Sequence, residues 1–361
     1  MLAVVKDPSK RGVVLEDVPV PQVGPWEVLV RVRAVGICGS DQRIYNEVNP
    51  ARRRRFIIGH EIAGDVVGIG DRVREVPQGA RVGVEICIGC GICRHCKVGR
   101  VNLCEKLEEF GVTVDGGMTE YVAVPARNVH LLPPTLSYEK AVLADPLACV
   151  IRGLEMIQVT SGSWVTILGP GQMGLLATQV VKRILRARVI MVGTRADRLA
   201  LARAMGADET VDVTRTDAVA AVRELTDGGA DFVYEAAGNA RALDDAIAMA
   251  RKGGAVVMLT VHRQVQVNLE PAIRGELHLI GAICYSYREY ERALGLLAED
   301  QIDVEPFLAH VFPLAQAQEA FDFVLARQGI KAILTVAGGE PSVGRGDAAS
   351  AGDGTADRRR H

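Results

Sequence analysis

The sequence lacks three features that would assign it to broad classes of protein: an excess of positive charge, a long apolar run and an internal repeat. Its 42 lysine and arginine residues are matched by 44 aspartate and glutamate residues, which gives a formal net charge of −2. A general nucleic-acid binder would normally be clearly basic, and no apolar run here is long enough to span a bilayer. We therefore expect neither nucleic acid nor a membrane as a partner.

The N-terminus also lacks the apolar segment of a signal peptide, because the charged turn Lys6-Asp7-Pro8 follows directly after the first apolar residues. We therefore expect the protein in the cytoplasm, where thiols stay reduced and either remain free or bind metal. A length of 361 residues with 48% hydrophobic and 24% charged residues is typical of a soluble globular protein with two domains.

The spacing of apolar residues changes along the chain. Up to about residue 135, short alternating segments such as 27–32 and 120–124, separated by glycine and proline, predict β-strands. From about residue 160, continuous apolar runs alternate with helical periods, which predicts a doubly wound α/β domain with a parallel sheet. The runs that we expect to form its strands are 164–168, 189–192, 231–234, 256–259 and 278–281.

The last part of the chain changes again after residue 285. Two helices around 290–297 and 317–325 and a short strand at 332–336 are predicted. Residues 338–361 lack apolar periodicity, and we expect them to form a disordered tail.

A glycine-rich turn at GPGQMG predicts a dinucleotide site, because it follows the strand 164–168 and opens an apolar helix over 173–184. Gly169 would permit the tight turn, Gly171 would let a pyrophosphate approach the backbone, and Gly174 would let helix and strand pack closely. The free N–H groups at the helix N-terminus would then bind the anion. The alternative is a glycine-rich turn without a ligand.

The choice between NAD and NADP depends on the end of the next strand. Here Gly193, Thr194 and Arg195 occupy the tip, and the first carboxylate is Asp197, inside the following helix. An acidic residue at the tip would bind the ribose of NAD, whereas a guanidinium can accept a 2′-phosphate. The sequence favours NADP; alternatively, Arg195 and Arg198 only occupy an exposed helix start and NAD binds through backbone contacts.

Half of the eight cysteines lie in GCGICRHCKVGRVNLC. Four thiolates at the spacing C-x2-C-x2-C-x7-C can close around one tetrahedral zinc, which leaves no position for substrate and predicts a structural site. A CxxC redox centre is the alternative, although such motifs open a helix in a βαβ unit and this region is rich in β-strands. His95 and Cys87 lie beside the predicted ligands, which are Cys90, Cys93, Cys96 and Cys104.

A second, sparser set of ligand-type residues suggests a metal site of another kind. It lies in the segments GICGSD, GHE and ADPLAC, which contain a thiol, an imidazole and carboxylates. Together with a nucleotide fold, these residues suggest three zinc ligands with an open fourth position. The residues concerned are Cys38, Ser40, Asp41, His60, Glu61, Asp145 and Cys149.

The order of these motifs resembles that of the zinc-dependent medium-chain alcohol dehydrogenases over about residues 1–337. The sequences VEICIGCGICRHCKVGRVNLC and ADPL look most like the polyol (sorbitol and xylitol) dehydrogenase branch, with the threonine dehydrogenases close behind. The resemblance implies a GroES-like, β-rich catalytic domain at 1–150 and 286–337, interrupted by a Rossmann domain at 151–285. It also implies a homodimer or homotetramer, with an edge at 277–284.

The resemblance implies roles for the residues of the sparser set. Cys38 and His60 look like ligands of a catalytic zinc, and Asp145 stands where polyol enzymes have a glutamate. Cys149, four residues later, is the rival third ligand. Glu61, next to His60, resembles a glutamate of the family. In the family this glutamate can either lie behind the zinc ligands or bind the metal itself.

Two further residues match the family, and one departs from it. Ser40 matches the hydroxyl that passes a proton from the substrate, and Asp41 the carboxylate that orients the histidine ligand. Arg43 stands where relatives often carry a relay histidine, so it could instead contact a cofactor phosphate or an anionic substrate. The run Arg52–Arg55 has two interpretations, a phosphate site or an exposed loop, and His262 and His310 match no motif.

The implied function is that of a zinc-dependent, NAD(P)-linked dehydrogenase with two zinc ions per chain, one catalytic and one structural. It would oxidise a secondary alcohol of a polyol, sugar, cyclitol or amino alcohol to the ketone. L-threonine 3-dehydrogenase activity is the alternative within the family. The alternative from another class is a catalytically silent nucleotide-binding structural protein.

Overall fold

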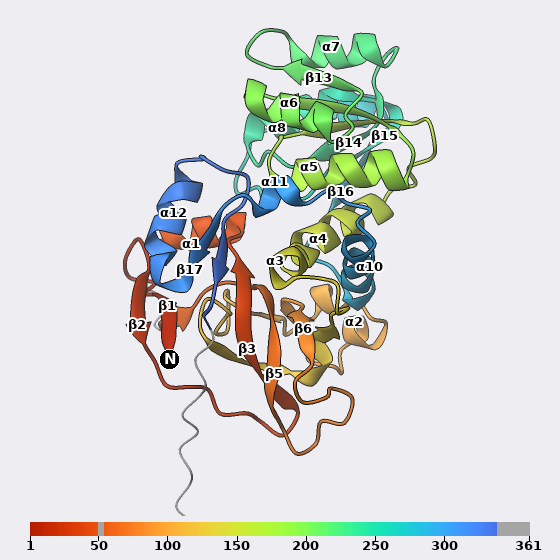
Figure 1. The fold of residues 1–361 in the computed structure, drawn as a ribbon. Coiled ribbons are helices and arrows are strands. Elements are labelled where there is room, and N and C mark those ends of the chain that lie inside the picture. The colour runs from red at the N-terminus through yellow and green to blue at the C-terminus, as the bar shows by residue number, and fades with distance from the viewer. Residues whose placement is uncertain (50–53, 338–361) are drawn as a thin grey trace, which may run out of the picture.

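Strand pairing divides the chain into two lobes (Figure 1). The computed structural model describes residues 1–49 and 54–337. One lobe contains a six-stranded parallel sheet and the other contains antiparallel sheets, with the parallel sheet at the top of the view in Figure 1. The predicted α/β class with a separate β-rich lobe is thereby confirmed.

The parallel sheet has the strand order β13-β12-β11-β14-β15-β16. Counted from β11 as the first strand, this is the order 3-2-1-4-5-6 of dinucleotide-binding folds. All five apolar runs expected to form its strands do so. The strands are β11 (Trp164–Leu168), β12 (Arg188–Gly193), β13 (Glu209–Asp212), β14 (Ala230–Glu235), β15 (Ala250–Met258) and β16 (His278–Gly281).

Helices cover both faces of this sheet. Strand side chains alternate between the two faces, so each face presents apolar residues that a set of helices buries. Val165 and Ile167 share a core cluster with α5 and α6, whereas Ile190 and Val192 share another with α7 and α8. The predicted helix 173–184 is α-helical only at first and ends in a π-helical segment, Val180–Ile184. The helices of this lobe are α5 (Gln172–Gln179), α6 (Ala196–Ala204), α7 (Ala218–Leu225), α8 (Ala240–Met249) and α9 (Glu270–Arg274).

The other lobe is built on β3, which pairs with β5, β9 and β18. Its main sheet has the order β10-β6-β5-β3-β18-β17, so the end of the chain returns to the lobe in which it began. The strands of this sheet are β3 (Glu27–Gly36), β5 (Glu61–Ile69), β6 (Arg81–Val84), β9 (Tyr121–Pro125), β10 (Val129–Leu131), β17 (Val311–Pro313) and β18 (Ile333–Thr335).

Two smaller sheets contain the remaining strands of the described residues. One has the order β2-β1-β4 and the other pairs β7 with β8. Their strands are β1 (Leu2–Lys6), β2 (Val14–Asp17), β4 (Phe56–Ile57), β7 (Cys87–Ile88) and β8 (Glu108–Glu109).

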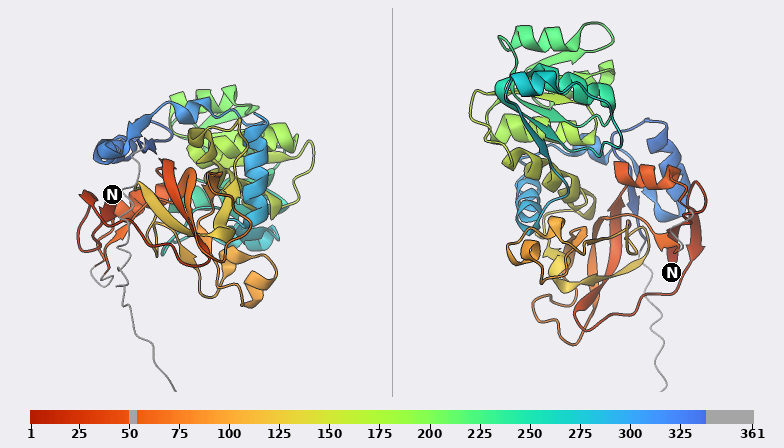
Figure 2. Two further views of the ribbon diagram at one scale, coloured as in Figure 1. Left: turned by 60° about the horizontal axis from the view of Figure 1, so that its bottom comes forward. Right: turned by 180° about the vertical axis from the view of Figure 1, so that it is seen from behind.

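Helix α4 (Ala144–Glu155) joins the two lobes. It packs against α5 and α10 (Tyr287–Ala298), the latter drawn in blue beside it in Figure 2. It also contacts β5 and β15. One core cluster accordingly includes buried residues of both lobes, such as Ala63 and Val165. Residue 150, the predicted domain boundary, lies within this continuous helix.

The remaining helices are short or peripheral. They are α1 (Gly39–Asn46), α2 (Arg94–Lys97), η1 (Val101–Leu103), η2 (Ala126–Asn128), α3 (Tyr138–Ala141), α11 (Glu305–Leu308), η4 (Leu314–Gln316) and α12 (Ala317–Leu325). Among the described residues, no helix is both long enough and apolar enough to cross a membrane.

Two predictions lie wholly or partly outside the described residues. The expected tail at 338–361 does so entirely, and so do Arg52 and Arg53 of the arginine run. Arg54 forms an ion pair with Asp115, and Arg55 forms one with Glu16 at 2.7 Å. These carboxylate partners favour the interpretation of an ordinary surface for that part of the run.

Candidate active site

The pairing of β3 with β5 brings together two motifs that lie far apart in the sequence. The antiparallel register places Gly36, the last residue of β3, opposite Glu61, the first residue of β5. Cys38 follows two residues later at the N-cap of α1, and His60 directly precedes β5. The thiol and the imidazole are therefore held side by side by backbone pairing alone.

The ligand atoms of Cys38, His60 and Glu61 all lie within 4.8 Å of one another. A thiolate, an imidazole and a carboxylate are the ligands that zinc binds in catalytic sites. Within the described part of the chain, the buried atoms His60 Nδ1 and Glu61 Oε1 have no hydrogen-bond partner. Since buried polar atoms are normally paired, these orphaned atoms fit a metal site.

Asp41 and Ser40 lie beside this group. The backbone N–H of Cys38 donates to Asp41 Oδ2 at 2.9 Å, and Asp41 Oδ1 lies 3.7 Å from His60 Nδ1. The buried hydroxyl oxygen of Ser40 has no partner among the described residues. The Asp41 carboxylate thus lies near the imidazole without a hydrogen bond to it, and Ser40 has a hydroxyl available for a ligand.

Burial and charge act in opposite directions on the pKa of His60. Burial would lower this pKa, but the carboxylate of Asp41 and the thiol of Cys38 outweigh it and raise the pKa above its usual value. The surroundings of the imidazole are therefore strongly negative. This is the electrostatic environment that a cation requires.

Asp145, the predicted third ligand, lies in the first turn of α4 and outside the group of three. Its carboxylate accepts a hydrogen bond from the hydroxyl of Tyr285, and burial raises its pKa to about 6. Its charge still acts on His60, so it borders the same site. Burial raises the pKa of Cys149, the rival ligand, well above its usual value, and its thiol lies outside the group of three.

Lys331 is a site residue that the sequence analysis missed. Its ammonium is buried, forms an ion pair with Glu61, and donates to the Ile37 carbonyl at 3.2 Å and to Gln172 Oε1 at 3.3 Å. β18, which follows Lys331, pairs with β3 so that Ile333 lies opposite Gly36. Because Gln172 begins α5, Lys331 connects the metal group with the glycine-rich loop.

The four cysteines predicted as a cage also come together, with ligand atoms within 4.8 Å of one another. The sulfur atoms of Cys93 and Cys104 lie 3.9 Å apart, close to the roughly 3.8 Å edge of a tetrahedral zinc–thiolate site. Backbone N–H groups of Cys96 and Glu105 lower the pKa of Cys93 to about 6. The thiols fit a closed zinc site, and His95 is not part of the group.

The glycine-rich loop has the shape that its three glycines predict. A Cβ on Gly174 would lie 2.1 Å from the Gly169 carbonyl oxygen, so only glycine allows helix and strand to pack this closely. Gly169 has a φ of +101°, which side chains rarely adopt. Above Gly171 there is open space, where a pyrophosphate could approach the backbone.

The residues predicted to distinguish NADP from NAD lie beside this loop. A Cβ on Gly193 would meet the Pro170 ring at 2.6 Å, so Gly193 packs directly against the loop. Thr194 is exposed. Arg195 forms a two-point ion pair with Asp197, with a shortest distance of 2.7 Å, and also donates to the Arg327 carbonyl at 2.7 Å.

Two family models match the chain, one in each lobe. The model described as "Alcohol dehydrogenase GroES-like domain" matches residues 24–134, and "Zinc-binding dehydrogenase" matches residues 173–299. A D-arabitol-phosphate dehydrogenase of Enterococcus avium is 35% identical over 325 residues, which cover 88% of this chain and 92% of the relative. The chain belongs to the zinc-dependent medium-chain alcohol dehydrogenase family.

Further similarities agree with this assignment. The sorbitol dehydrogenase of Bacillus subtilis is 33% identical, over 88% of this chain and 92% of its own length. A structure from Sinorhizobium meliloti 1021, assigned to the zinc-binding dehydrogenases and bound to NADP, is 33% identical with a TM-score of 0.85. It covers 92% of this chain and 98% of its own. The protein is accordingly a polyol-dehydrogenase-like oxidoreductase that uses zinc, a nicotinamide cofactor and a small alcohol.

In this dehydrogenase, a second polar cluster that the sequence analysis missed lies at the carboxyl end of β14. The buried carboxylate of Glu235 accepts from the N–H groups of Ala237 and Gly238 at 2.8 and 2.7 Å, and it also pairs with His262 Nε2 at 2.9 Å. Ligands of such sheets bind beyond the carboxyl ends of the strands. His262 therefore borders the cofactor side of the sheet, although no sequence motif marks it.

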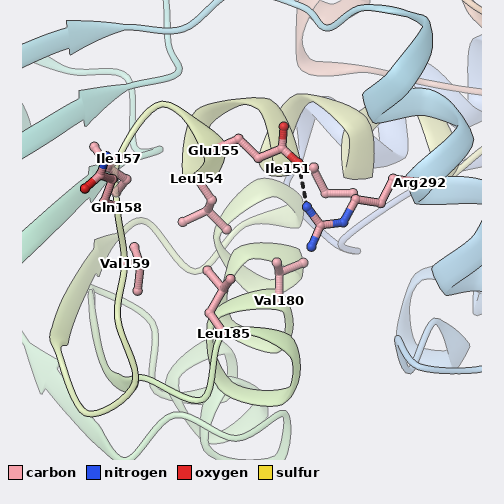
Figure 3. A pocket seen from close by; sticks show the side chains of 9 residues that line it. All are labelled: Ile151, Leu154, Glu155, Ile157, Gln158, Val159, Val180, Leu185 and Arg292. Carbon is pink, nitrogen blue, oxygen red and sulfur yellow. Dashed lines mark hydrogen bonds and ion pairs between the residues drawn. The ribbon is translucent and has the colours of Figure 1, made fainter.

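A separate pocket of about 200 Å³ lies away from the dehydrogenase's candidate site, between α4, the π-helical segment and α10 (Figure 3). Its lining is mostly apolar and includes the ion pair between Glu155 and Arg292. No residue of the metal groups or of the glycine-rich loop lines it. Its side chains are Ile151, Leu154, Glu155, Ile157, Gln158, Val159, Val180, Leu185 and Arg292.

Proposed function

We propose that this dehydrogenase oxidises a secondary alcohol of a polyol to the ketone, with NADP preferred over NAD. The observation that carries the proposal is the position of Lys331, which contacts both Glu61 of the metal group and Gln172 of the glycine-rich loop. A zinc-bound hydroxyl and a nicotinamide held by that loop would therefore meet in one place.

Each residue of the site has a proposed task. Cys38 and His60 would hold the catalytic zinc, and Asp41 would keep the imidazole in its orientation. Zinc there would act as a Lewis acid that lowers the pKa of the alcohol, and the nicotinamide would accept the hydride. The Ser40 hydroxyl, which has no partner in the described part of the chain, would accept the proton and pass it to water.

The third ligand is proposed to be Asp145, with Glu61 as the alternative. Glu61 lies within the group of three, but its charge is already balanced by Lys331. Asp145 is a buried carboxylate without a lysine or arginine ion-pair partner among the described residues. Burial disfavours the charged form of this carboxyl group unless a positive charge lies nearby, and a zinc ion would supply that charge.

The cysteine cage is proposed to hold a second, structural zinc ion. Four sulfur ligands fill a tetrahedron, so neither water nor substrate can reach the metal. All eight cysteines are free thiols in the structure, which supports this proposal and a cytoplasmic location for the protein.

A panel of alcohols tests the function. The purified, zinc-loaded protein would be assayed with free polyols, polyol phosphates, cyclitols and amino alcohols, each with NAD and NADP, by absorbance of the reduced nicotinamide. We expect the highest kcat/KM with a polyol or its phosphate. Highest activity with L-threonine would instead assign the protein to the threonine 3-dehydrogenases. Absence of turnover with every alcohol and ketone, despite bound zinc, would indicate a catalytically silent nucleotide-binding protein.

Replacing Arg195 with serine tests the cofactor preference. We propose that a 2′-phosphate takes the place of Asp197 as the partner of this guanidinium. A hydrogen bond to a charged group contributes about 1.5–3 kcal/mol, so kcat/KM with NADP should fall by roughly 10- to 100-fold while that with NAD changes little. Arg203→Ser, on the same helix, is the control and should change neither value. Equal or better use of NAD by the wild type would contradict the preference.

The assembly is proposed to be a homodimer or homotetramer. Strand β16 forms one edge of the parallel sheet, and Leu279 and Ile283 beside this edge are 38% and 45% exposed. An open edge with apolar side chains normally requires a covering partner. A second copy of the chain would supply it.

A further inference from the structure

A third group of metal-binding side chains lies apart from the two groups described above. It consists of Cys87, Glu109 and Cys284, whose ligand atoms all lie within 4.8 Å of one another. Cys87 is buried and the other two are half-buried. None of the three takes part in the proposed reaction or in the cysteine cage, and two thiols with a carboxylate are ligands that zinc accepts.

Strand pairing and one loop bring these residues together from both lobes. The register of β7 and β8 places Cys87 directly opposite Glu109, so the two side chains lie on the same face of the hairpin. Cys284 lies in the loop after β16, and its thiol donates to Glu109 Oε1 at 3.6 Å. The group therefore bridges the hairpin of one lobe and a loop at the edge of the parallel sheet of the other.

Two hydrogen bonds from residues next to this strand pair, one in η1 and one just before β7, hold the loop that carries Cys284. The side-chain amide of Asn102 donates to the Ile283 carbonyl at 2.9 Å, and the N–H of Ile86 donates to the Tyr285 hydroxyl at 3.2 Å. Cys284 has a φ of +45°, a left-handed conformation that residues other than glycine seldom adopt. The fold thus keeps the Cys284 thiol within contact of Glu109.

The geometry fits a metal ion better than a disulfide bond. Bonds of about 2.3 Å from zinc to sulfur and 2.1 Å to oxygen, at the tetrahedral angle, place the two ligand atoms about 3.6 Å apart. Cys284 Sγ and Glu109 Oε1 are separated by 3.6 Å. A disulfide would need the sulfurs about 2.05 Å apart and would leave the carboxylate without a role, and both cysteines are free.

We propose that Cys87, Glu109 and Cys284 form an additional zinc site that joins the β7–β8 hairpin to the loop after β16. Two thiolates and one carboxylate occupy three tetrahedral positions, and water occupies the fourth. The role proposed for this ion is to crosslink the two lobes, although its fourth position is open to water, unlike that of the cysteine cage. The ion fixes the loop that carries Tyr285, whose hydroxyl donates to Asp145 at the border of the active site.

The number of zinc ions per chain tests this proposal. The full-length protein, and each variant, is dialysed against zinc sulfate with a phosphine reductant, then against metal-free buffer, and zinc is measured by inductively coupled plasma mass spectrometry. We expect about three zinc ions per wild-type chain and about two in Cys87→Ser and Cys284→Ser. Glu109→Gln should bind the same ion at least tenfold more weakly in a chelator competition. Glu108→Gln, at the next and exposed position of β8, is the matched control and should equal the wild type.

A double variant separates this site from the cysteine cage. Cys93→Ser should remove the cage zinc alone, and Cys93→Ser combined with Cys284→Ser should lose one ion more. If Cys284→Ser does not fold, as judged by circular dichroism, the Glu109→Gln affinity decides the question. A Cys284→Ser or Glu109→Gln protein that binds as much zinc, as tightly, as the wild type would overturn the proposal. So would a Cys87–Cys284 disulfide found by mass spectrometry in protein kept under the same reductant.

Discussion

Replacing His60 with alanine is expected to abolish nearly all turnover and to remove about one zinc ion per chain. The imidazole is one of three ligand groups within 4.8 Å of one another, so its loss leaves too few ligands to retain a catalytic zinc. Lewis-acid stabilisation contributes several kcal/mol, and about 1.4 kcal/mol corresponds to a tenfold change in rate. We therefore expect kcat/KM to fall by about a thousandfold or more.

The control for this experiment is His95→Ala, because His95 lies in the short helix α2 between two cage cysteines but outside every metal group. This variant should keep full zinc content and activity. Zinc content and kcat/KM are measured together on both variants, with folding checked by circular dichroism. If His60→Ala retains wild-type activity and zinc content, Cys38, His60 and Glu61 do not form the catalytic centre.

Much of this site could be predicted from the sequence, because its motifs are local. The turn GPGQMG and the cysteine cage each lie within one short segment, and the spacing within that segment largely determines how it can fold. The buried strands could also be predicted from the sequence, since a continuous apolar run such as Trp164–Leu168 is typical of a parallel strand covered on both faces. Helix α12 begins and ends where the apolar periodicity predicts.

The residues that could not be predicted act through contacts across long sequence separations. Lys331 and Glu61 are 270 positions apart, and only the pairing of β18 with β3 brings them together. Glu235 and His262 meet because Glu235 ends β14 and His262 follows β15, the neighbouring strand of the sheet. No local sequence pattern marks a single lysine, glutamate or histidine as part of a site. These partners can therefore be identified only once the pairing of the strands is known.

Replacing Lys331 with methionine is expected to destabilise the fold by about 3–5 kcal/mol, the cost of leaving one buried charge without its partner. Both side chains of the Lys331–Glu61 pair are 0% exposed. The pair is also tightly enclosed, since a Cβ on Gly36 would lie 1.9 Å from Glu61 Oε2. The free energy of unfolding would be measured by urea denaturation of the zinc-loaded protein, followed by far-ultraviolet circular dichroism.

The matched control is Lys140→Met, which removes a lysine that forms an ion pair with Asp300 at 3.2 Å near the surface. Surface pairs contribute about 0–1 kcal/mol, so this change should be small. The double variant Glu61→Gln/Lys331→Met should recover part of the loss, because it leaves no unpaired charge, and a coupling of about 0.5–3 kcal/mol is expected for residues in contact. A Lys331→Met protein as stable as Lys140→Met would show that another cation balances Glu61. The catalytic zinc would be the candidate for this cation, and Glu61 would then replace Asp145 as its third ligand.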